Sequence, residues 1–388
     1  MMSSVLDSGA SQAPPLSAFA AQQLGADRAA LAQSLRALLW QHGVRWPAWI
    51  DARPGRLQLL LADCVDPPLA ATRRMLWMQQ RDALSQGLIA MGLAVAAPRL
   101  ALWLPAAGPS YRQAADERPG AVAELYAPAA YPSQPTRALP DSEGRAWAVP
   151  AEQLVHIAAL LDERSLITPR APWISVVGAV QQPAVLTLSS EPTTPRQLVA
   201  RSGGATTSAW VPLLADPVHG SIWEADRPLP AWSSGVSPPV MYVLPPGHEL
   251  IRRHRASPSL RARAANACLA CTLCTDLCPT AETGTKPHLL MRALGQASGQ
   301  HLAPQTVAAA AGCTHCGVCS VACPAELLPG AVVAAFAATL PGPQPAEDDP
   351  PPLPDLSRLP WPLMLARLGL DRFAPIPIQP RTEAIQSG

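Results

Sequence analysis

Hydrophobic positions in the first part of the chain follow helical and strand-like spacings in turn. Leucines recur at helical spacing through 27–42 and Gly43 follows as a stop, which predicts an amphipathic helix there. The next elements that the pattern predicts are a strand at 57–62, helices at 69–84 and 87–95, and a strand at 100–104. Because strands alternate with helices, we expect 26–165 to form a small α/β domain with some parallel pairing. Residues 1–25 lack such a pattern, and we expect them to be disordered.

The pattern changes after Trp173 to short β-rich segments around a single helix. The expected elements are strands at 174–180, 185–188, 211–214 and 240–244, and a helix at 195–201. Pro212 lacks a backbone N–H, so we expect the 211–214 strand to lie at a sheet edge. We expect 166–248 to form one α+β module in which a helix lies on a sheet.

In the rest of the chain we expect proline-rich borders and two further helices. The 46 prolines concentrate in three candidate linkers or loop-rich borders, 132–150, 224–246 and 341–380. A helix is expected at 287–299 within a domain at 249–340. Residues 341–388 are expected to be a proline-rich tail with one helix at 361–370.

Length, charge and hydropathy limit the classes of protein to which this chain can belong. A chain of 388 residues should form two or three domains. The formal net charge of +1 gives no electrostatic argument for binding nucleic acid or an anionic membrane surface. The most apolar stretch, 87–104, is interrupted by Pro98 and Arg99, so no membrane span is expected. Residues 1–15 do not read as a secretory signal.

Eight of the nine cysteines form two copies of one pattern, C-x2-C-x2-C-x3-C-P. The first copy is Cys268, Cys271, Cys274 and Cys278 with Pro279, and the second is Cys313, Cys316, Cys319 and Cys323 with Pro324. This spacing is typical of bacterial two-cluster ferredoxins, in which the fourth cysteine of each run ligates the other [4Fe–4S] cluster. The expected ligand sets are therefore Cys268, Cys271, Cys274 and Cys323 for a first cluster, and Cys313, Cys316, Cys319 and Cys278 for a second.

Cysteines also bind structural zinc or form disulfides. Structural zinc prefers two C-x2-C pairs with a longer gap between them and four ligands per ion. A disulfide framework is typical of short, cysteine-dense secreted domains. The duplicated spacing favours two cubanes over a zinc site or a disulfide framework. Because such clusters are oxygen-sensitive and no export signal is expected, we expect the protein in the reducing cytosol.

Three further features leave alternatives open. Cys64, the ninth cysteine, is either a redox thiol or a buried free cysteine. His315, inside the second cysteine run, either tunes a cluster through a hydrogen bond or faces solvent. A basic run before the first cysteine run either docks an acidic redox partner or is a solvated linker; it comprises Arg252, Arg253, His254, Arg255, Arg261 and Arg263.

Several short segments match one family in the same order along the chain. They are Asp63–Pro67, Val176–Val180 with Pro183, Gly203–Ala205, Val243–His248, Pro287–Arg292 and Ala366–Leu370. With the cysteine runs, they make the chain resemble the corrinoid (cobalamin) reductases of propanediol-utilisation microcompartments. More distantly, the chain resembles the C subunit of the Rnf electron-transport complex.

That resemblance implies a flavin/NADH domain at 26–165, a β-grasp module of the soluble-ligand-binding (SLBB) type at 166–248, and a dicluster domain at 249–340. Relatives carry a Gly-Gly-Ala-Gly-Phe-Pro-Thr string after the first helix, whereas this chain has the shorter Gly43–Ala48 with one glycine. Only glycine lets backbone N–H groups close on a phosphate without a Cβ in the way. We therefore expect a degenerate nucleotide loop in which Gly43 and Arg45 are the remaining candidates, while Trp46 and Trp49 fit ordinary packing.

The sequence thus predicts a multi-domain electron-transfer protein with two [4Fe–4S] clusters and no catalytic acid or base. We expect it to relay electrons from a flavoprotein or NADH to an acceptor such as a corrinoid enzyme. The alternatives are an NADH-dependent corrinoid reductase with bound FMN, and a cluster-containing scaffold. The expected location is the cytoplasm, with a bacterial microcompartment and its shell as a further possibility from the resemblance.

Overall fold

The computed structural model describes most of the chain but not all of it. The described residues are 28–41, 44, 46, 50–51, 55, 57–105, 113–114, 122–127, 130–131, 145–161, 173–188, 191–230, 240–255, 260–281, 284–296, 313, 316–337 and 359–376. Gly43, Arg45, Trp49, His315 and the segment 1–25, for which the sequence carried expectations, lie outside them.

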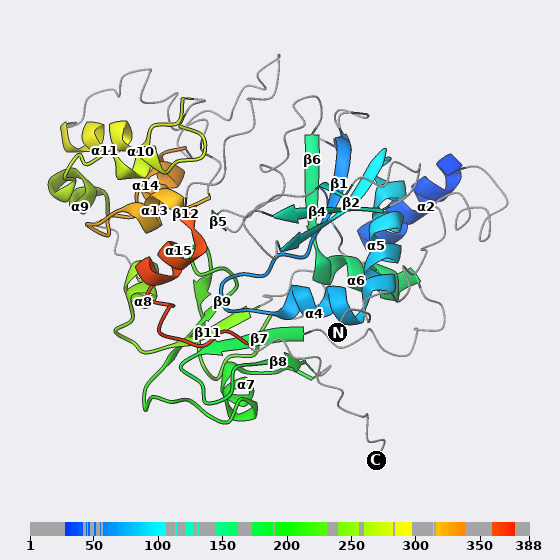
Figure 1. Ribbon diagram of the computed structural model, residues 1–388, viewed down its shortest axis with the longest axis horizontal. Coiled ribbons are helices and arrows are strands. Elements are labelled where there is room, and N and C mark those ends of the chain that lie inside the picture. Colours follow the sequence, from blue (N-terminus) through cyan, green and yellow to red (C-terminus); the bar gives the residue numbers. More distant parts are fainter. Residues whose placement is uncertain are drawn as a thin grey trace, which may run out of the picture.

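The N-terminal part contains a five-stranded sheet in which four strands are parallel (Figure 1). The order is β3-β4-β2-β1-β6, and only β3 runs antiparallel to its neighbour β4. The strands are β1 (Leu57–Asp63), β2 (Arg99–Pro105), β3 (Gln113–Ala114), β4 (Val122–Ala127) and β6 (Arg145–Pro150). Central strands β1 and β2 read as continuous apolar runs because both of their faces are covered, as is usual in parallel sheets. The expected parallel α/β pairing is confirmed.

The helices whose full bounds the structure describes beside this sheet are α2 (Arg28–Gln41), α4 (Thr72–Gln79), α5 (Arg81–Ala94) and α6 (Ala151–Leu161). The second half of α5 is buried, because it packs against the sheet and against both α2 and α6. A Cβ at Gly87 would lie 1.9 Å from the carbonyl oxygen of Leu154, so glycine is what lets α6 approach α5 so closely. The side chains of α2, α5 and α6 form one hydrophobic core with one face of the sheet.

The expected helices at 69–84 and 87–95 were placed wrongly. The chain bends at Gln80 (φ −131°), and residues 81–94 form a single helix. The start of α4 is anchored on the second sheet, where the Ser175 hydroxyl accepts hydrogen bonds from the backbone N–H groups of Ala71 and Thr72. Helix α5 packs on the first sheet, whereas α4 contacts α5 and α6 and also β7, so the bend at Gln80 allows α4 to reach the second sheet.

Strands β4 and β6 and helix α6 were not predicted. Strand β6 falls inside the proline-rich stretch 132–150, which had been a candidate linker. It lies at the edge of the sheet and Pro150 is its last residue, a position where a missing N–H group is tolerated. Proline content therefore marked the end of a strand rather than the absence of one.

The second sheet is mixed, with the order β10-β9-β11-β7-β8. Its strands are β7 (Trp173–Gly178), β8 (Ala184–Thr187), β9 (Val211–Leu214), β10 (Ser221–Ile222) and β11 (Val240–Leu244). Helix α7 (Pro195–Arg201) begins with a capping box, in which Thr194 and Gln197 bond each other's backbone N–H, and it covers one face of this sheet. The β-grasp (SLBB-like) assignment of this module remains a proposal.

The expectation that β9 lies at a sheet edge was wrong. Strand β9 pairs with β11 on one side and with β10 on the other. The ladder with β10 joins only Leu213 and Leu214, and next to it the carbonyl of Pro212 accepts from the N–H of Trp223. Because the partner strand is so short, the missing N–H of Pro212 interrupts no ladder there.

The cysteine runs lie among short helices on the face of the second sheet opposite α7 (Figure 1). These helices are α8 (Glu249–His254), α9 (Leu260–Ala267), α10 (Leu273–Asp276), α11 (Pro287–Gln296), α13 (Val318–Ala322) and α14 (Pro329–Ala337). The expected helix at 287–299 is present as α11. In the part of the chain that the structure describes, no helix is long and apolar enough to cross a membrane.

A C-terminal segment, Leu359–Ile376, packs into the core instead of forming a separate tail (Figure 1). Strand β12 (Leu359–Pro360) pairs with β5 (Ala130–Tyr131), and α15 (Trp361–Arg367) follows. The helix ends in a Schellman motif at Gly369 (φ 65°), three residues earlier than expected, with Leu370 N–H bonded to Leu365 O at 2.9 Å. A Cβ at Gly369 would lie 2.6 Å from Oε2 of Glu249, so this turn requires glycine.

This C-terminal segment contacts all three other parts of the protein. The N–H of Ile376 donates to Leu69 O in the N-terminal part, at 3.3 Å. Buried His248, which follows the second sheet, donates from Nε2 to Gly369 O at 3.1 Å. Arg367 donates to Ala322 O, at the end of α13 beside the cysteines, at 2.7 Å. One segment thus ties the two sheets and the cysteine-bearing helices together.

Candidate metal centre

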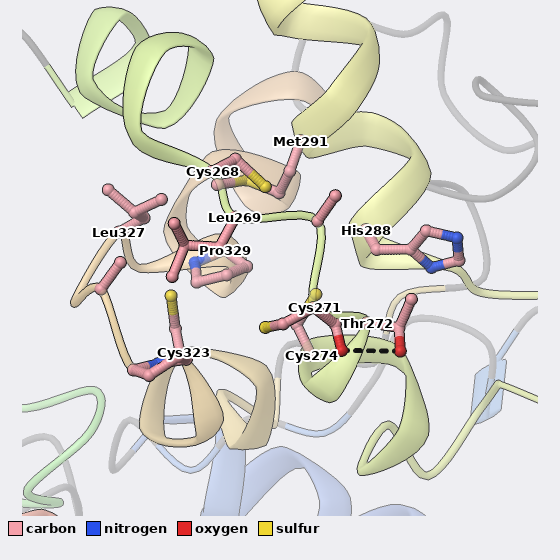
Figure 2. Close-up of a pocket in the computed structure, with 13 residues that line it drawn as sticks. Cys268, Leu269, Cys271, Thr272, Cys274, His288, Met291, Cys323, Leu327 and Pro329 are labelled. Atoms are coloured by element: carbon pink, nitrogen blue, oxygen red, sulfur yellow. Dashed lines mark hydrogen bonds between the residues drawn. The ribbon is translucent and has the colours of Figure 1, made fainter.

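The eight cysteines gather around two pockets, in the crossed combination that the spacing predicted. Cys268, Cys271, Cys274 and Cys323 line the first pocket. Figure 2 shows the sulfur atoms of these four residues around one common space, which Met291, Leu327 and Pro329 also border. Cys278, Cys313, Cys316 and Cys319 line the second pocket. Each pocket therefore receives three cysteines from one run and the fourth cysteine of the other run.

The two cysteine loops share a backbone conformation that brings their cysteines together. Thr272 and Gly317, the residues after the second cysteine of each run, are both left-handed, with φ of 62° and 76°. Each precedes a short helix, α10 or α13, and its carbonyl accepts a hydrogen bond from the residue three positions later. Left-handed turns of this kind present successive N–H groups to one side, a geometry found in phosphate and iron–sulfur sites.

Helices α10 and α13 connect the two pockets. Cys274 on α10 lines the first pocket, and Cys278 just beyond that helix lines the second. Cys319 on α13 lines the second pocket, and Cys323 after that helix lines the first. The two helices pack against each other, so the pockets are neighbours within one unit.

Electrostatics within each set fit a metal-binding role. Burial first, and then the neighbouring thiolates of Cys323, Cys268 and Cys271, raise the pKa of Cys274 to about 12. Burial, followed by Cys316, Cys313 and Cys278, raises the pKa of Cys319 well above its usual range. Thiols with such pKa values stay protonated near neutral pH, whereas bound iron would neutralise the gathered negative charge and hold them as thiolates.

The chemistry of each donor set fits an iron–sulfur cluster. Among the residues that the structure describes, no three His, Cys, Asp or Glu side chains converge closely enough to hold a single metal ion. A zinc ion needs all four ligands about 2.0–2.3 Å from one centre. A [4Fe–4S] cluster binds each cysteine through a different iron, so its ligands stand further apart. The donor set and its arrangement therefore fit a cubane in each pocket.

The surroundings of the two pockets differ. Apolar side chains dominate around the first pocket, and it reaches the surface, where Cys271 is exposed and Leu269 is 72% exposed. Pro217, Val218 and His219 from the β9–β10 turn, together with Arg253 and His254 from α8, line the second pocket. The second cysteine set thus lies between the cysteine-bearing helices and the second sheet.

Two residues of the basic run before the first cysteine run, Arg253 and His254, are packed against the cysteine-bearing part, whereas Arg252, Arg255 and Arg263 are exposed. Residues 252–254 lie on helix α8, where Arg252 is exposed but Arg253 and His254 are partly buried beside the second pocket. Arg253 donates from Nη1 to Ser320 O at 2.8 Å, and His254 donates from Nε2 to Pro217 O at 3.0 Å. Burial lowers the pKa of His254, so this ring is neutral near pH 7. The spacing of the cysteines carries no signal for either contact.

A buried charge network lies at the carboxyl end of β1 and the start of α6. Arg73 forms a bidentate pair with Glu152, with both distances 3.1 Å, and a hydrogen bond of 2.6 Å with Asp63. Asp66 accepts from the backbone N–H groups of Arg73 and Arg74, and burial raises its pKa to about 6. The segment Asp63–Pro67 stands out in the sequence, but Arg73, which joins it to α6, carries no sequence signal. These carboxylates are paired within the protein.

The other expected features of the N-terminal part have structural roles in the described residues. Burial raises the pKa of the Cys64 thiol well above its usual range, which favours the buried free cysteine over a redox thiol. Trp46 packs against the core and donates from Nε1 to Asp51 at 3.0 Å, as the packing interpretation predicted. The candidate loop residues Gly43 and Arg45 lie outside the described residues.

Comparisons with known proteins agree with the cysteine chemistry. Residues 267–328 match the family model of a 4Fe-4S dicluster domain. Cobalamin reductase PduS of Salmonella typhimurium (strain LT2) is 34% identical over 183 residues, which are 46% of this chain and 38% of that protein. Cobalamin reductase PduS of Citrobacter freundii is 33% identical over a stretch of the same length and coverage. The match therefore spans about two fifths of the length of these curated relatives.

Two solved structures of an NAD+-reducing [NiFe]-hydrogenase are more distant neighbours. The H2-reduced form gives a TM-score of 0.44 at 16% identity, covering 84% of this chain and 64% of that chain. The air-oxidized form gives 0.42 at 16% identity, covering 93% and 69%. Likenesses this distant assign neither fold nor function. The resemblance to cobalamin reductases that the motifs predicted is confirmed, and the chain carries a 4Fe-4S dicluster domain.

Proposed function

We propose that this protein transfers electrons through two [4Fe–4S] clusters. The first would be held by Cys268, Cys271, Cys274 and Cys323, and the second by Cys278, Cys313, Cys316 and Cys319. The observation that carries the proposal is the crossed sorting of the eight cysteines between two adjacent pockets. When bound, each cubane supplies a site that accepts and releases one electron.

The residues around each pocket determine how far that site is exposed to solvent and to other proteins. Apolar side chains exclude water from the inner side of the first pocket, while Leu269 and Cys271 leave its outer side at the surface. The second pocket lies between α8 and the β9–β10 turn, and three of its four cysteines, Cys278, Cys316 and Cys319, are buried. This arrangement supports a relay in which the first site exchanges electrons with a partner protein and the second lies behind it.

The proposed partners follow from the resemblance. A flavoprotein is the proposed donor, and a corrinoid enzyme or another redox enzyme is the proposed acceptor. The expected cytoplasmic location, within a bacterial microcompartment or outside one, also remains a proposal.

Cysteine replacement tests the ligand sets directly. Cys271→Ser and Cys316→Ser should each remove or convert one cluster, so anaerobically purified variants should lose up to half of the iron and sulfide. Cys64→Ser is the matched control, because Cys64 is a buried cysteine far from both runs in the sequence. Two intact cubanes in either ligand variant, seen by electron paramagnetic resonance after dithionite reduction, would contradict the assignment.

A second candidate function is NADH oxidation by the N-terminal part, with FMN as an intermediate carrier. The parallel sheet favours it, because α/β folds bind ligands at the carboxyl ends of such strands. The visible spectrum before and after NADH addition distinguishes the two functions. If NADH bleaches the iron–sulfur absorption, the chain is a reductase; if only dithionite does so and no flavin is present, it is a relay.

A further inference from the structure

Arg253 reaches the cysteine pockets from a part of the chain outside the cysteine runs. It lies on α8, immediately after the last strand of the second sheet, and lines the second pocket. Its neighbour Arg252 is on the exposed side of the same helix, near Glu326 at 3.6 Å. Of these two adjacent arginines, only Arg253 is directed toward the cysteines.

The guanidinium of Arg253 lies close to both cysteine sets. Nη1 donates to Ser320 O at 2.8 Å, and Ser320 sits on α13 between Cys319 of the second set and Cys323 of the first. Arg253 also interacts electrostatically with the Cys323 thiolate. A partly buried cation is therefore placed beside α13, between a cysteine of each set.

One polar atom of Arg253 is left without a partner. Its Nε is buried and has no hydrogen-bond acceptor among the described residues. A buried N–H group without an acceptor costs about 1–3 kcal/mol, and such groups in native proteins usually have a partner. The cysteines of the pocket that Arg253 lines, and a cluster bound to them, supply sulfur acceptors for this group.

The positive charge of Arg253 also affects the reduction potential of a nearby cluster. A guanidinium does not lose its proton in proteins, so it remains a cation despite its burial. Reduction of a cluster adds one negative charge, and a nearby buried cation stabilises the reduced form more than the oxidised form. Net charge and hydrogen bonds to sulfur are among the factors that set the potentials of iron–sulfur clusters.

We propose that Arg253 donates a hydrogen bond from Nε to a sulfur of the second cluster and raises the reduction potentials of both clusters, that of the second cluster more. Arg253 is thus a tuning residue that acts mainly on the second cluster. This inference rests on the two-cluster function proposed above.

Potentiometric titration with dithionite, followed by electron paramagnetic resonance, tests the proposal in the full-length protein. The signal altered in the Cys316→Ser variant identifies the second cluster. In Arg253→Gln, the equilibrium constant for one-electron reduction of the second cluster should fall at least about tenfold, which is about 59 mV for one electron. The first cluster should shift in the same direction by less.

Two further variants separate charge from hydrogen bonding. Arg253→Lys keeps the positive charge and a donor for Ser320 O but loses the Nε–H group, so only the second cluster should become harder to reduce, and by less than in Arg253→Gln. Arg252→Gln makes the same charge change one residue away on the exposed side, and it should leave both potentials unchanged.

Each outcome has a distinct meaning. Unchanged potentials in Arg253→Gln, or an equal shift in Arg252→Gln, would overturn the inference. If Arg253→Gln does not retain its clusters, Arg253→Lys decides, and an unchanged second potential in that variant overturns it. A wild-type protein without two reducible cubanes would instead overturn the proposed function itself.

Discussion

At the scale of single residues, Gly317 and Thr272 show how one backbone conformation meets two different surroundings. Both adopt a left-handed conformation after the second cysteine of their run. The side chain of Thr272 is accommodated and hydrogen-bonds to Asp276 Oδ2 at 2.9 Å. A Cβ at Gly317 would lie 2.3 Å from Val218 Cγ1 and 3.1 Å from His219 Nε2. The second loop therefore requires glycine because the second sheet packs directly on it.

Replacing Gly317 by Ala should destabilise the protein by about 2–4 kcal/mol, since left-handed strain and a clash with Val218 add. Iron content should fall through loss of the second cluster. Gly284→Ala is the matched control, because Gly284 has φ of 103° but no atom within 4 Å of its added Cβ. It should cost only about 1–2 kcal/mol of backbone strain. Chemical unfolding and iron analysis measure both effects, and equal losses in the two variants would contradict this explanation.

The sequence could predict the cysteines but not the residues that surround them. Spacing within a short loop is local information, so the crossed sets followed from the two runs alone. Arg253 and Val218 reach the second pocket only because α8 and the β9–β10 turn pack there. Arg73 pairs with Asp63 and also with Glu152, which is 79 positions further along the sequence, a pairing that no local pattern encodes. Local sequence patterns therefore do not predict the contacts that tertiary packing makes.

At the scale of secondary-structure elements, periodicity predicted the long, regular segments and failed where packing overrides it. Strands β1, β2, β7 and β11 were predicted from continuous apolar runs and are present. The bend at Gln80 was not predictable, because it depends on which sheet α4 and α5 each contact. Strand β6 was missed because prolines were taken as marks of a linker, although its edge position tolerates Pro150.

The C-terminal segment makes a prediction at this scale. A chain ending at residue 358 would lose Leu359–Ile376 and expose the apolar core that Met364, Leu368 and Leu370 fill. Because burial of each such side chain contributes about 1.5–3 kcal/mol, the truncated protein should lose at least about 4 kcal/mol of stability. It should also release iron faster, because Arg367 no longer holds the end of α13 next to Cys323.

A chain ending at residue 376 is the control, because it keeps every contact described for this segment. Thermal unfolding and the rate of iron release to a chelator compare the two truncations. If both behave like the full chain, the segment does not support the cysteine-bearing helices.

At the scale of the whole molecule, the two cysteine pockets face different surroundings. The second is bordered by α8 and the β9–β10 turn of the second sheet, whereas the first carries the exposed side chain of Leu269 beside Cys271. An exposed apolar residue next to a redox site is a suitable anchor for a partner protein. On the proposed relay, electrons therefore enter or leave through the first pocket.

Leu269→Glu tests this route. Electron exchange with a flavodoxin, followed by stopped flow, should become at least about fivefold slower, since an apolar anchor contributes about 1 kcal/mol or more to a protein contact. Direct reduction by dithionite and the iron content should not change. Leu363→Glu is the control, because Leu363 is another exposed leucine (44%) but lies on α15 and does not line the first pocket. Equal slowing in both variants would argue against the first pocket as the docking site.

The position of the C-terminal segment also fixes the order in which the molecule can be completed. During translation, residues 359–376 leave the ribosome after both sheets and both cysteine runs. Their bonds to Leu69, His248 and Ala322 can form only once those three parts already exist. The contacts that this segment makes with the cysteine-bearing helices can therefore form only after both cysteine runs have been synthesised.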